Sequence, residues 1–174
     1  NYPGIQGMGF SEKFSSQESD ALIATVKKAG HPDFKLWPEH EGDERHAIIY
    51  LEPRDRRNEA ALGFDMFQNP VRRAAMEAAR DSGEPAASGK VVLVQEIDPE
   101  QQSGFLIYAP VYRNNAPIDT LEQRRTALFG FVYSPFRADD FLGPVFHDAD
   151  ISFKVYDGSE VKPDALLFTS SPSA

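Results

Sequence analysis

Residues 69–112 constrain the fold most, because they contain a helix with both ends marked and then two apolar runs. Asn69 can cap a helix, since a short polar side chain accepts a hydrogen bond from a free backbone N–H. Pro70 suits the first helical position, where an N–H is not needed. Gly83 can adopt the left-handed conformation that ends a helix. The sequence therefore predicts a helix that starts at residue 70 and stops at Gly83.

One side of this helix is expected to pack closely against a sheet, because its apolar residues are small and recur every three or four positions. These residues are Val71, Ala74, Ala75, Ala78 and Ala79. The arginines of the helix are expected to lie on a solvated face, since charged side chains are mostly exposed. They are Arg72, Arg73 and Arg80.

The two apolar runs, 91–94 and 105–112, predict a β-hairpin whose connector contains Asp98-Pro99 and Gly104. Pro110 cannot donate to a strand ladder, so the second strand should be an edge or carry a bulge there. Further strands are expected at 47–51, 127–134, 151–155 and 165–169. Helices are expected after the capping boxes Ser15/Glu18 and Thr120/Gln123, and at 139–146. Antiparallel strands with helices between them indicate an α+β fold.

Composition excludes several classes of function. The chain has 174 residues, a net charge of −9 and no cysteine, and it shows no basic stripe of the kind that nucleic-acid binders carry. The four histidines (His31, His40, His46 and His147) have no metal-binding spacing. Phosphate loops and nucleophile elbows are also absent from the sequence. We therefore expect a protein without catalysis, metal or cofactor.

Asp65 is the polar residue of most interest, because it lies between Phe64 and Met66 in a segment that is expected to be buried. A buried carboxylate needs a partner, since burying it unpaired costs several kcal/mol. It could form an internal salt bridge with Arg72 or Arg73, or cap the next turn. It could equally accept hydrogen bonds from a ligand.

Several motifs together resemble the CHASE domain, a sensory module attached to histidine kinases and nucleotide cyclases. They are GFD, NPVRRA, ARDSGEPAASG, the valine-rich run and PVYR within residues 63–113, with YPGIQGMGF before them and ALFGFVYSPFRADDFL after them. The resemblance runs from Tyr2 to about Leu142 and continues more loosely to Ala174. It implies a PAS-like fold: an antiparallel sheet flanked by helices.

The resemblance also implies a small-molecule site. In plant cytokinin receptors, the aspartate that matches Asp65 binds the polar edge of the ligand, and the backbone that matches Ala87 adds a hydrogen bond. The strand that matches 105–108 lines the pocket. The expected site residues are Asp65, Ala87, Phe105, Ile107, Tyr108 and Tyr133. Tyr108 replaces a small hydroxyl residue of those receptors and Ala87 a larger aliphatic one, so the ligand itself does not carry over. We expect a small amphiphilic ligand, for which a purine-like ring is one candidate.

We expect two lobes, a ligand-binding lobe over 1–135 and part of a second, membrane-proximal PAS-like lobe over 136–174. The resemblance implies the periplasmic or extracellular part of a membrane receptor in two-component or cyclic di-GMP signalling. The chain is then a piece excised from a longer protein, attached to the membrane only through flanking segments. Two alternatives stay open: an interaction or homodimerisation module without a small-molecule ligand, and a free extracellular carrier.

Overall fold

The computed structural model describes residues 4–39, 42–99, 101–146 and 152–170. Its strands are β1 (Met8–Ser15), β2 (Glu44–Glu52), β3 (Ala86–Ala87), β4 (Val91–Val92), β5 (Ser103–Tyr112), β6 (Leu128–Arg137), β7 (Lys154–Tyr156) and β8 (Leu166–Thr169). Its helices are α1 (Ser19–Lys28), α2 (Arg56–Ala61), α3 (Pro70–Ser82), α4 (Leu121–Ala127) and α5 (Ala138–Val145), with 3-10 turns η1 (Ser16–Glu18), η2 (Met66–Gln68) and η3 (Pro163–Ala165).

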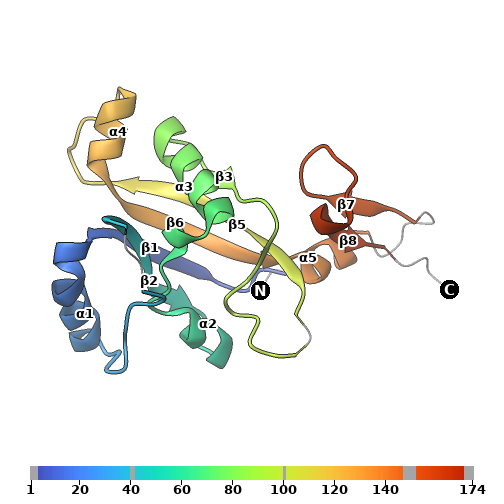
Figure 1. The fold of residues 1–174 in the computed structure, drawn as a ribbon, viewed down its shortest axis with the longest axis horizontal. Coiled ribbons are helices and arrows are strands. Elements are labelled where there is room, and N and C mark those ends of the chain that lie inside the picture. The colour runs from blue at the N-terminus through green and yellow to red at the C-terminus, as the bar shows by residue number, and fades with distance from the viewer. Residues whose placement is uncertain (1–3, 40–41, 100, 147–151, 171–174) are drawn as a thin grey trace.

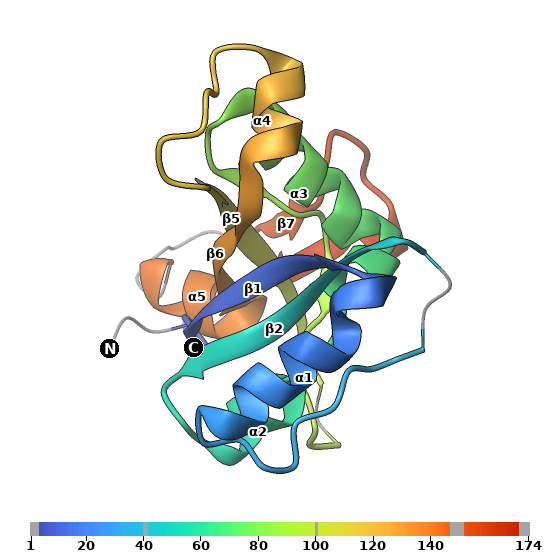
Figure 2. The same ribbon diagram turned by 90° about the vertical axis from the view of Figure 1, so that its left-hand side faces the viewer.

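The main sheet has six strands in the order β2-β1-β6-β5-β3, and β4 also pairs with β5. All of these pairs are antiparallel. Helix α3 covers one face of the sheet, which we call the inner face (Figure 1). Helices α1 and α2 lie beside the β1–β2 end (Figure 2). The expected α+β, PAS-like fold is confirmed.

Both predicted ends of α3 are confirmed. The Asn69 side chain accepts hydrogen bonds from the backbone N–H groups of Val71 and Arg72, each at 3.1 Å, and Pro70 is the first helical residue. Gly83 ends the helix with φ of 81°, and its N–H donates to the Ala79 carbonyl. Local sequence alone was therefore enough to define this element.

The predicted orientation of α3 was wrong by about one residue. The buried residues are Arg72, Ala75, Met76, Ala79 and Arg80, whereas Val71, Ala74 and Ala78 are exposed. The expectation of a solvated face was therefore wrong for Arg72 and Arg80. Met76, which has no exposed surface, explains the rotation, because its large apolar side chain buries more area than any alanine.

The two prolines inside strands lie where the ladder allows them. Strand β5 pairs with β3 and β4 only before Pro110, so it is an edge on that side at Pro110, as predicted. The strand expected to stop before Pro135 was predicted too short, because β6 continues to Arg137. Beyond the β1–β6 pairing, the Pro135 carbonyl still accepts from the Gln6 N–H at 2.9 Å, and the Asn58 amide donates to the Gln6 carbonyl at 3.2 Å, so no N–H is needed from Pro135.

The first strand of the predicted hairpin is shorter than expected. Strand β4 covers only Val91 and Val92, and the next residues turn away from the sheet although Leu93 is buried. Strand β5 and the antiparallel β4–β5 pairing are as predicted.

The C-terminal residues form a separate small hairpin, β7–β8, beyond α5 (Figure 1). Both strands were expected, although Ile151 lies outside the described residues. Lys90 connects this hairpin to the main sheet, since its N–H donates to the Asp157 carboxylate at 2.8 Å and its ammonium to the Asp164 carbonyl at 2.8 Å. The division into lobes at residue 135 stays a prediction.

Candidate functional site

Asp65 is buried, with 2% of its surface exposed. Its Oδ1 accepts hydrogen bonds from the backbone N–H of Phe67 and that of His46, each at 3.0 Å. The first bond caps the turn η2, and the second connects that turn to β2. Asp65 thus has the capping role that its sequence position allowed. Whether it also meets a ligand stays a prediction.

His46 extends this buried polar group. Its ring has no exposed surface and lies between Phe67 and Phe131, with ring centroids at 4.6 and 5.3 Å. Its Nε2 contacts the Glu44 carboxylate at 3.1 Å. Burial lowers the pKa of His46, so the neutral ring donates from Nε2, while the hydrogen bond from His46 lowers the pKa of Glu44 to about 2. Glu44 is the first residue of β2.

Tyr108 and Tyr133 lie side by side on the inner face, one on β5 and one on β6. Their ring centroids are 6.1 Å apart, and their exposed fractions are 0% and 1%. Among the described residues, the Tyr108 hydroxyl donates a hydrogen bond only to the Met66 sulfur, at 3.6 Å, which is a weak acceptor. The Tyr133 hydroxyl has no hydrogen-bond partner among the described residues. Burial raises the pKa of both phenols, so both remain donors.

Arg72 lies on α3, whose buried residues Ala75 and Met76 pack in one interior cluster with these two phenols. It is 2% exposed. One guanidinium nitrogen, Nη2, donates to the Val92 carbonyl at 3.0 Å, and the group lies over the Phe64 ring at 5.2 Å. Its Nε has no hydrogen-bond partner among the described residues.

The structure does not bring all of the predicted site residues together. Side chains alternate between the two faces of a strand. Tyr108 lies on the inner face, so Phe105 and Ile107 lie on the outer one. Phe105 stacks there on Phe136 with ring centroids at 4.9 Å, and Ile107 is 37% exposed. Neither can line an interior site with Asp65.

Ala87 lies in the short edge strand β3, opposite Ile107, and its side chain is exposed. Its backbone belongs to the rim of the sheet, and whether it contacts a ligand stays a prediction. Of the six predicted residues, the structure therefore places Asp65, Tyr108 and Tyr133 in the interior.

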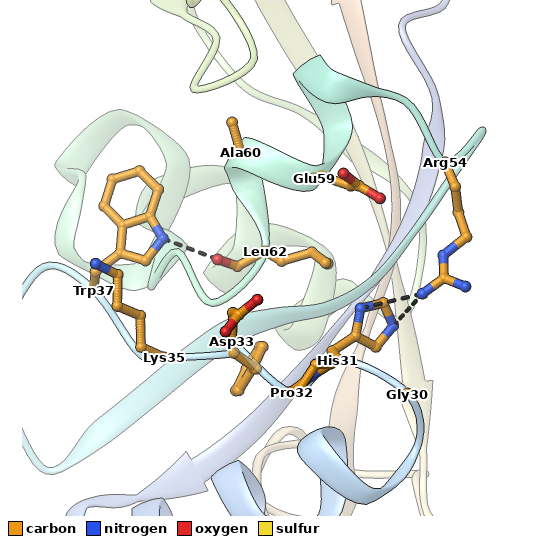
Figure 3. Close-up of a pocket in the computed structure, with 11 residues that line it drawn as sticks. Gly30, His31, Pro32, Asp33, Lys35, Trp37, Arg54, Glu59, Ala60 and Leu62 are labelled. Carbon is orange, nitrogen blue, oxygen red and sulfur yellow. Dashed lines mark hydrogen bonds between the residues drawn. The ribbon is translucent and has the colours of Figure 1, made fainter.

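Five surface pockets of the described chain are lined by other residues. One, of about 410 Å³, lies between the segment after α1 and helix α2 (Figure 3). At one end His31 contacts the Arg54 guanidinium at 3.0 and 3.2 Å, and at the other the Trp37 indole N–H donates to the Leu62 carbonyl at 2.9 Å. The polar groups at these two ends satisfy one another, and none of the six predicted site residues lines this pocket.

Sequence reasoning missed Arg72 and His46 as interior residues. A signal for Arg72 existed, because positions 72, 76 and 79 form a helical stripe through the large Met76. None existed for His46, whose burial depends on η2 packing against β2.

Comparisons with known proteins agree with this architecture. The family model of the CHASE domain matches residues 1–168. No curated protein matches the chain significantly. In the part of the chain that the structure describes, no helix is long and apolar enough to cross a membrane. CHASE domains are extracellular sensory domains of membrane receptors and are not themselves catalytic. With nearly its whole length matched, the chain belongs to the CHASE domain family.

Proposed function

We propose that this domain is the small-molecule sensor of a transmembrane histidine kinase or nucleotide cyclase, signalling through phosphotransfer or cyclic di-GMP. Its ligand lies between α3 and the inner face of the sheet. Tyr108 and Tyr133 form the floor, and Asp65 with the backbone near Ala87 supports the polar edge. Pockets of this kind combine apolar walls with a few polar anchors.

One observation carries this proposal: the fully buried Tyr133 hydroxyl makes no hydrogen bond within the described chain. Buried polar groups are almost always hydrogen-bonded. Phenylalanine would fill the same space without leaving an unsatisfied hydroxyl. A hydroxyl kept here is explained if a ligand accepts its hydrogen bond.

Entry to this site requires movement, since side chains of the protein fill it in this structure. One route in is the segment after β4, residues 93–99, which contains no helix or strand but must release the Arg137–Glu96 and Arg57–Asp98 ion pairs to move. The Arg72 guanidinium donates a hydrogen bond to the carbonyl of Val92, which precedes this segment. Displacing the segment would therefore open the space beside α3. Binding would then favour the open arrangement by its differential affinity for the two states.

The test is a thermal-shift screen of small molecules on the wild type and on Tyr133→Phe. A ligand at about 100 times its Kd stabilises a protein by about 2.7 kcal/mol. We expect unliganded Tyr133→Phe to be as stable as the wild type, and its ligand response to be weaker. Tyr112→Phe is the control, since its hydroxyl donates to the Arg80 carbonyl at 2.6 Å, and it should lose stability but keep the response. A screen without any stabilising compound would contradict the proposal.

An interaction module is the second candidate, favoured by the outer face of the sheet. Tyr50, Phe10 and Val132 are paired side by side across three strands there. Tyr50 is 53% exposed and Val132 38%. Apolar surface of this kind often marks a protein contact. If this outer face joins two copies of the chain, Val132→Lys should abolish the dimer in analytical sedimentation. Val161→Lys is the control and should keep the dimer, because Val161 is 78% exposed on the C-terminal hairpin.

A further inference from the structure

We propose that the ligand of the interior site carries a carboxylate group, bound by the Arg72 guanidinium together with the Tyr108 and Tyr133 hydroxyls. This inference rests on the proposed function and adds the chemical class of the ligand. The inference depends on the positive charge of Arg72, which has no negatively charged partner in the interior of the described chain.

Arg72 is a buried cation without a counter-charge. It forms no salt bridge with a carboxylate among the described residues; its partners are the Val92 carbonyl and the Phe64 ring. Removing a guanidinium from water costs several kcal/mol unless an opposite charge compensates it. Burial accordingly lowers the pKa of Arg72.

Other arginines of the described chain have their positive charge compensated by a carboxylate. Arg80, two turns further along the same helix, is 9% exposed and contacts the Asp81 carboxylate at 2.7 Å. Arg137 contacts the buried Glu96 carboxylate, also at 2.7 Å. Arg57 contacts the Asp98 carboxylate at 2.6 Å. Arg72 is more buried than Arg80 and lacks such a contact, so it differs from the other buried arginine of the described chain.

The groups around Arg72 are donors as well. Both phenols stay protonated, and neither finds a strong acceptor: Tyr108 reaches only a thioether, and Tyr133 has no partner among the described residues. The first turn of α3 contains no acidic residue that could offset the positive end of the helix dipole. A site with three unmatched donors and one positive charge fits an acceptor with one negative charge.

A carboxylate fits these requirements better than a phosphate dianion. The planar guanidinium matches the two oxygens of a carboxylate, which can accept two parallel hydrogen bonds. A single guanidinium balances one negative charge, whereas a dianion would leave a second charge buried and uncompensated. The apolar neighbours Met66, Met76 and Leu106 would surround the rest of the molecule.

The experiment compares each acid of a broad panel of small carboxylic acids with its carboxamide, at matched ionic strength, by thermal shift. Acetate, benzoate and indole-3-acetate belong to this panel. The proteins are the wild type, Arg72→Gln, Arg72→Met and the control Arg80→Gln. Arg80→Gln removes a buried arginine that already has carboxylate partners.

We expect at least one acid, and not its amide, to raise the melting temperature of the wild type. Both Arg72 variants should lose that shift, and Arg80→Gln should keep it from a lower starting temperature. Unliganded Arg72→Met should melt at or above the wild type, because it removes an uncompensated charge; a purely structural arginine would lower it.

Two outcomes overturn the inference, and they are distinguishable. If amides stabilise as well as acids, or the Arg72 variants keep the shift for acids, the carboxylate assignment is wrong while the sensor function stands. If neither acids nor amides stabilise any of the four proteins, the interior site is wrong and the proposed function fails with it.

Discussion

At the residue scale, the interior of this domain contains polar groups of two kinds. Asp65 and His46 connect η2 to β2 through hydrogen bonds, although the His46 Nδ1 has no hydrogen-bond partner among the described residues. Arg72 and Tyr133 each retain an atom without a hydrogen bond in the described chain. Asp65 and His46 join two elements of the fold, whereas Arg72 and Tyr133 are the groups that the proposed ligand would contact.

Asp65→Ala should lower the free energy of unfolding by about 2–4 kcal/mol, because two buried N–H groups lose their acceptor. Asp65→Asn should cost less, since its amide oxygen can still accept from both. Urea unfolding measures both variants. Equal stability of Asp65→Ala and the wild type would show that the cap is dispensable.

The free energy of unfolding should decrease as pH falls, because of His46 and Glu44, whose side chains contact each other. The pKa of His46 in the folded state lies below 6.5. As pH falls through 6.5, the unfolded chain takes up a proton that the folded chain does not, so the free energy of unfolding decreases. The pKa of Glu44 falls from 4.5 to about 2, so its contribution is present above pH 4.5 and is lost as pH falls towards 2.

Urea unfolding between pH 8 and about pH 2 tests this prediction, with Glu44→Gln as the matched variant. Glu44→Gln should lose less stability than the wild type below pH 4.5, and it should keep the part of the loss that His46 causes. Identical pH profiles for the two proteins would refute the assignment to Glu44.

At the element scale, α3 positions Arg72, and its ends are fixed by local chemistry. The helix stops at Gly83, whose φ of 81° is strained for residues with a Cβ. An added Cβ at Gly83 would meet its nearest atom at 3.6 Å, an ordinary contact. The backbone conformation, and not crowding, therefore decides the cost of a substitution there.

Gly83→Ala should reduce the free energy of unfolding by about 1 kcal/mol, and Gly83→Asn by less, because asparagine tolerates the left-handed region better. Chemical denaturation measures the difference. If alanine costs no more than asparagine, the backbone argument does not hold.

At the scale of the whole molecule, the proposed site lies next to the connection between the sheet and the C-terminal hairpin. Arg72 bonds to Val92, and Lys90, two residues earlier, bonds to Asp157 of the hairpin. A ligand that displaced β4 would therefore disturb this connection.

Asp157→Ala should loosen the hairpin from the sheet, because it removes the acceptor of the Lys90 N–H at 2.8 Å and leaves the bond from the Lys90 ammonium to the Asp164 carbonyl. Faster amide hydrogen exchange is expected in β7 and β8, with β5 and β6 unchanged. Glu160→Ala is the control, since that residue pairs only with Lys162 on the exposed tip. Unchanged exchange in Asp157→Ala would mean that other contacts hold the hairpin.

The sequence by itself determined the elements and the family. The caps of α3, the capping boxes before α1 and α4, and the edge position at Pro110 all depend on neighbours in the chain, so they were predictable. The motifs of residues 63–113 carried the CHASE resemblance for the same reason.

Only the tertiary structure decided which side chains share the interior. It turned α3 so that Arg72 faces the sheet, and strand alternation placed Phe105 and Ile107 on the face opposite Tyr108. It also brought His46 beneath η2. Local propensity sets where a helix starts and stops, whereas the side it buries depends on the total apolar area that packing removes from water.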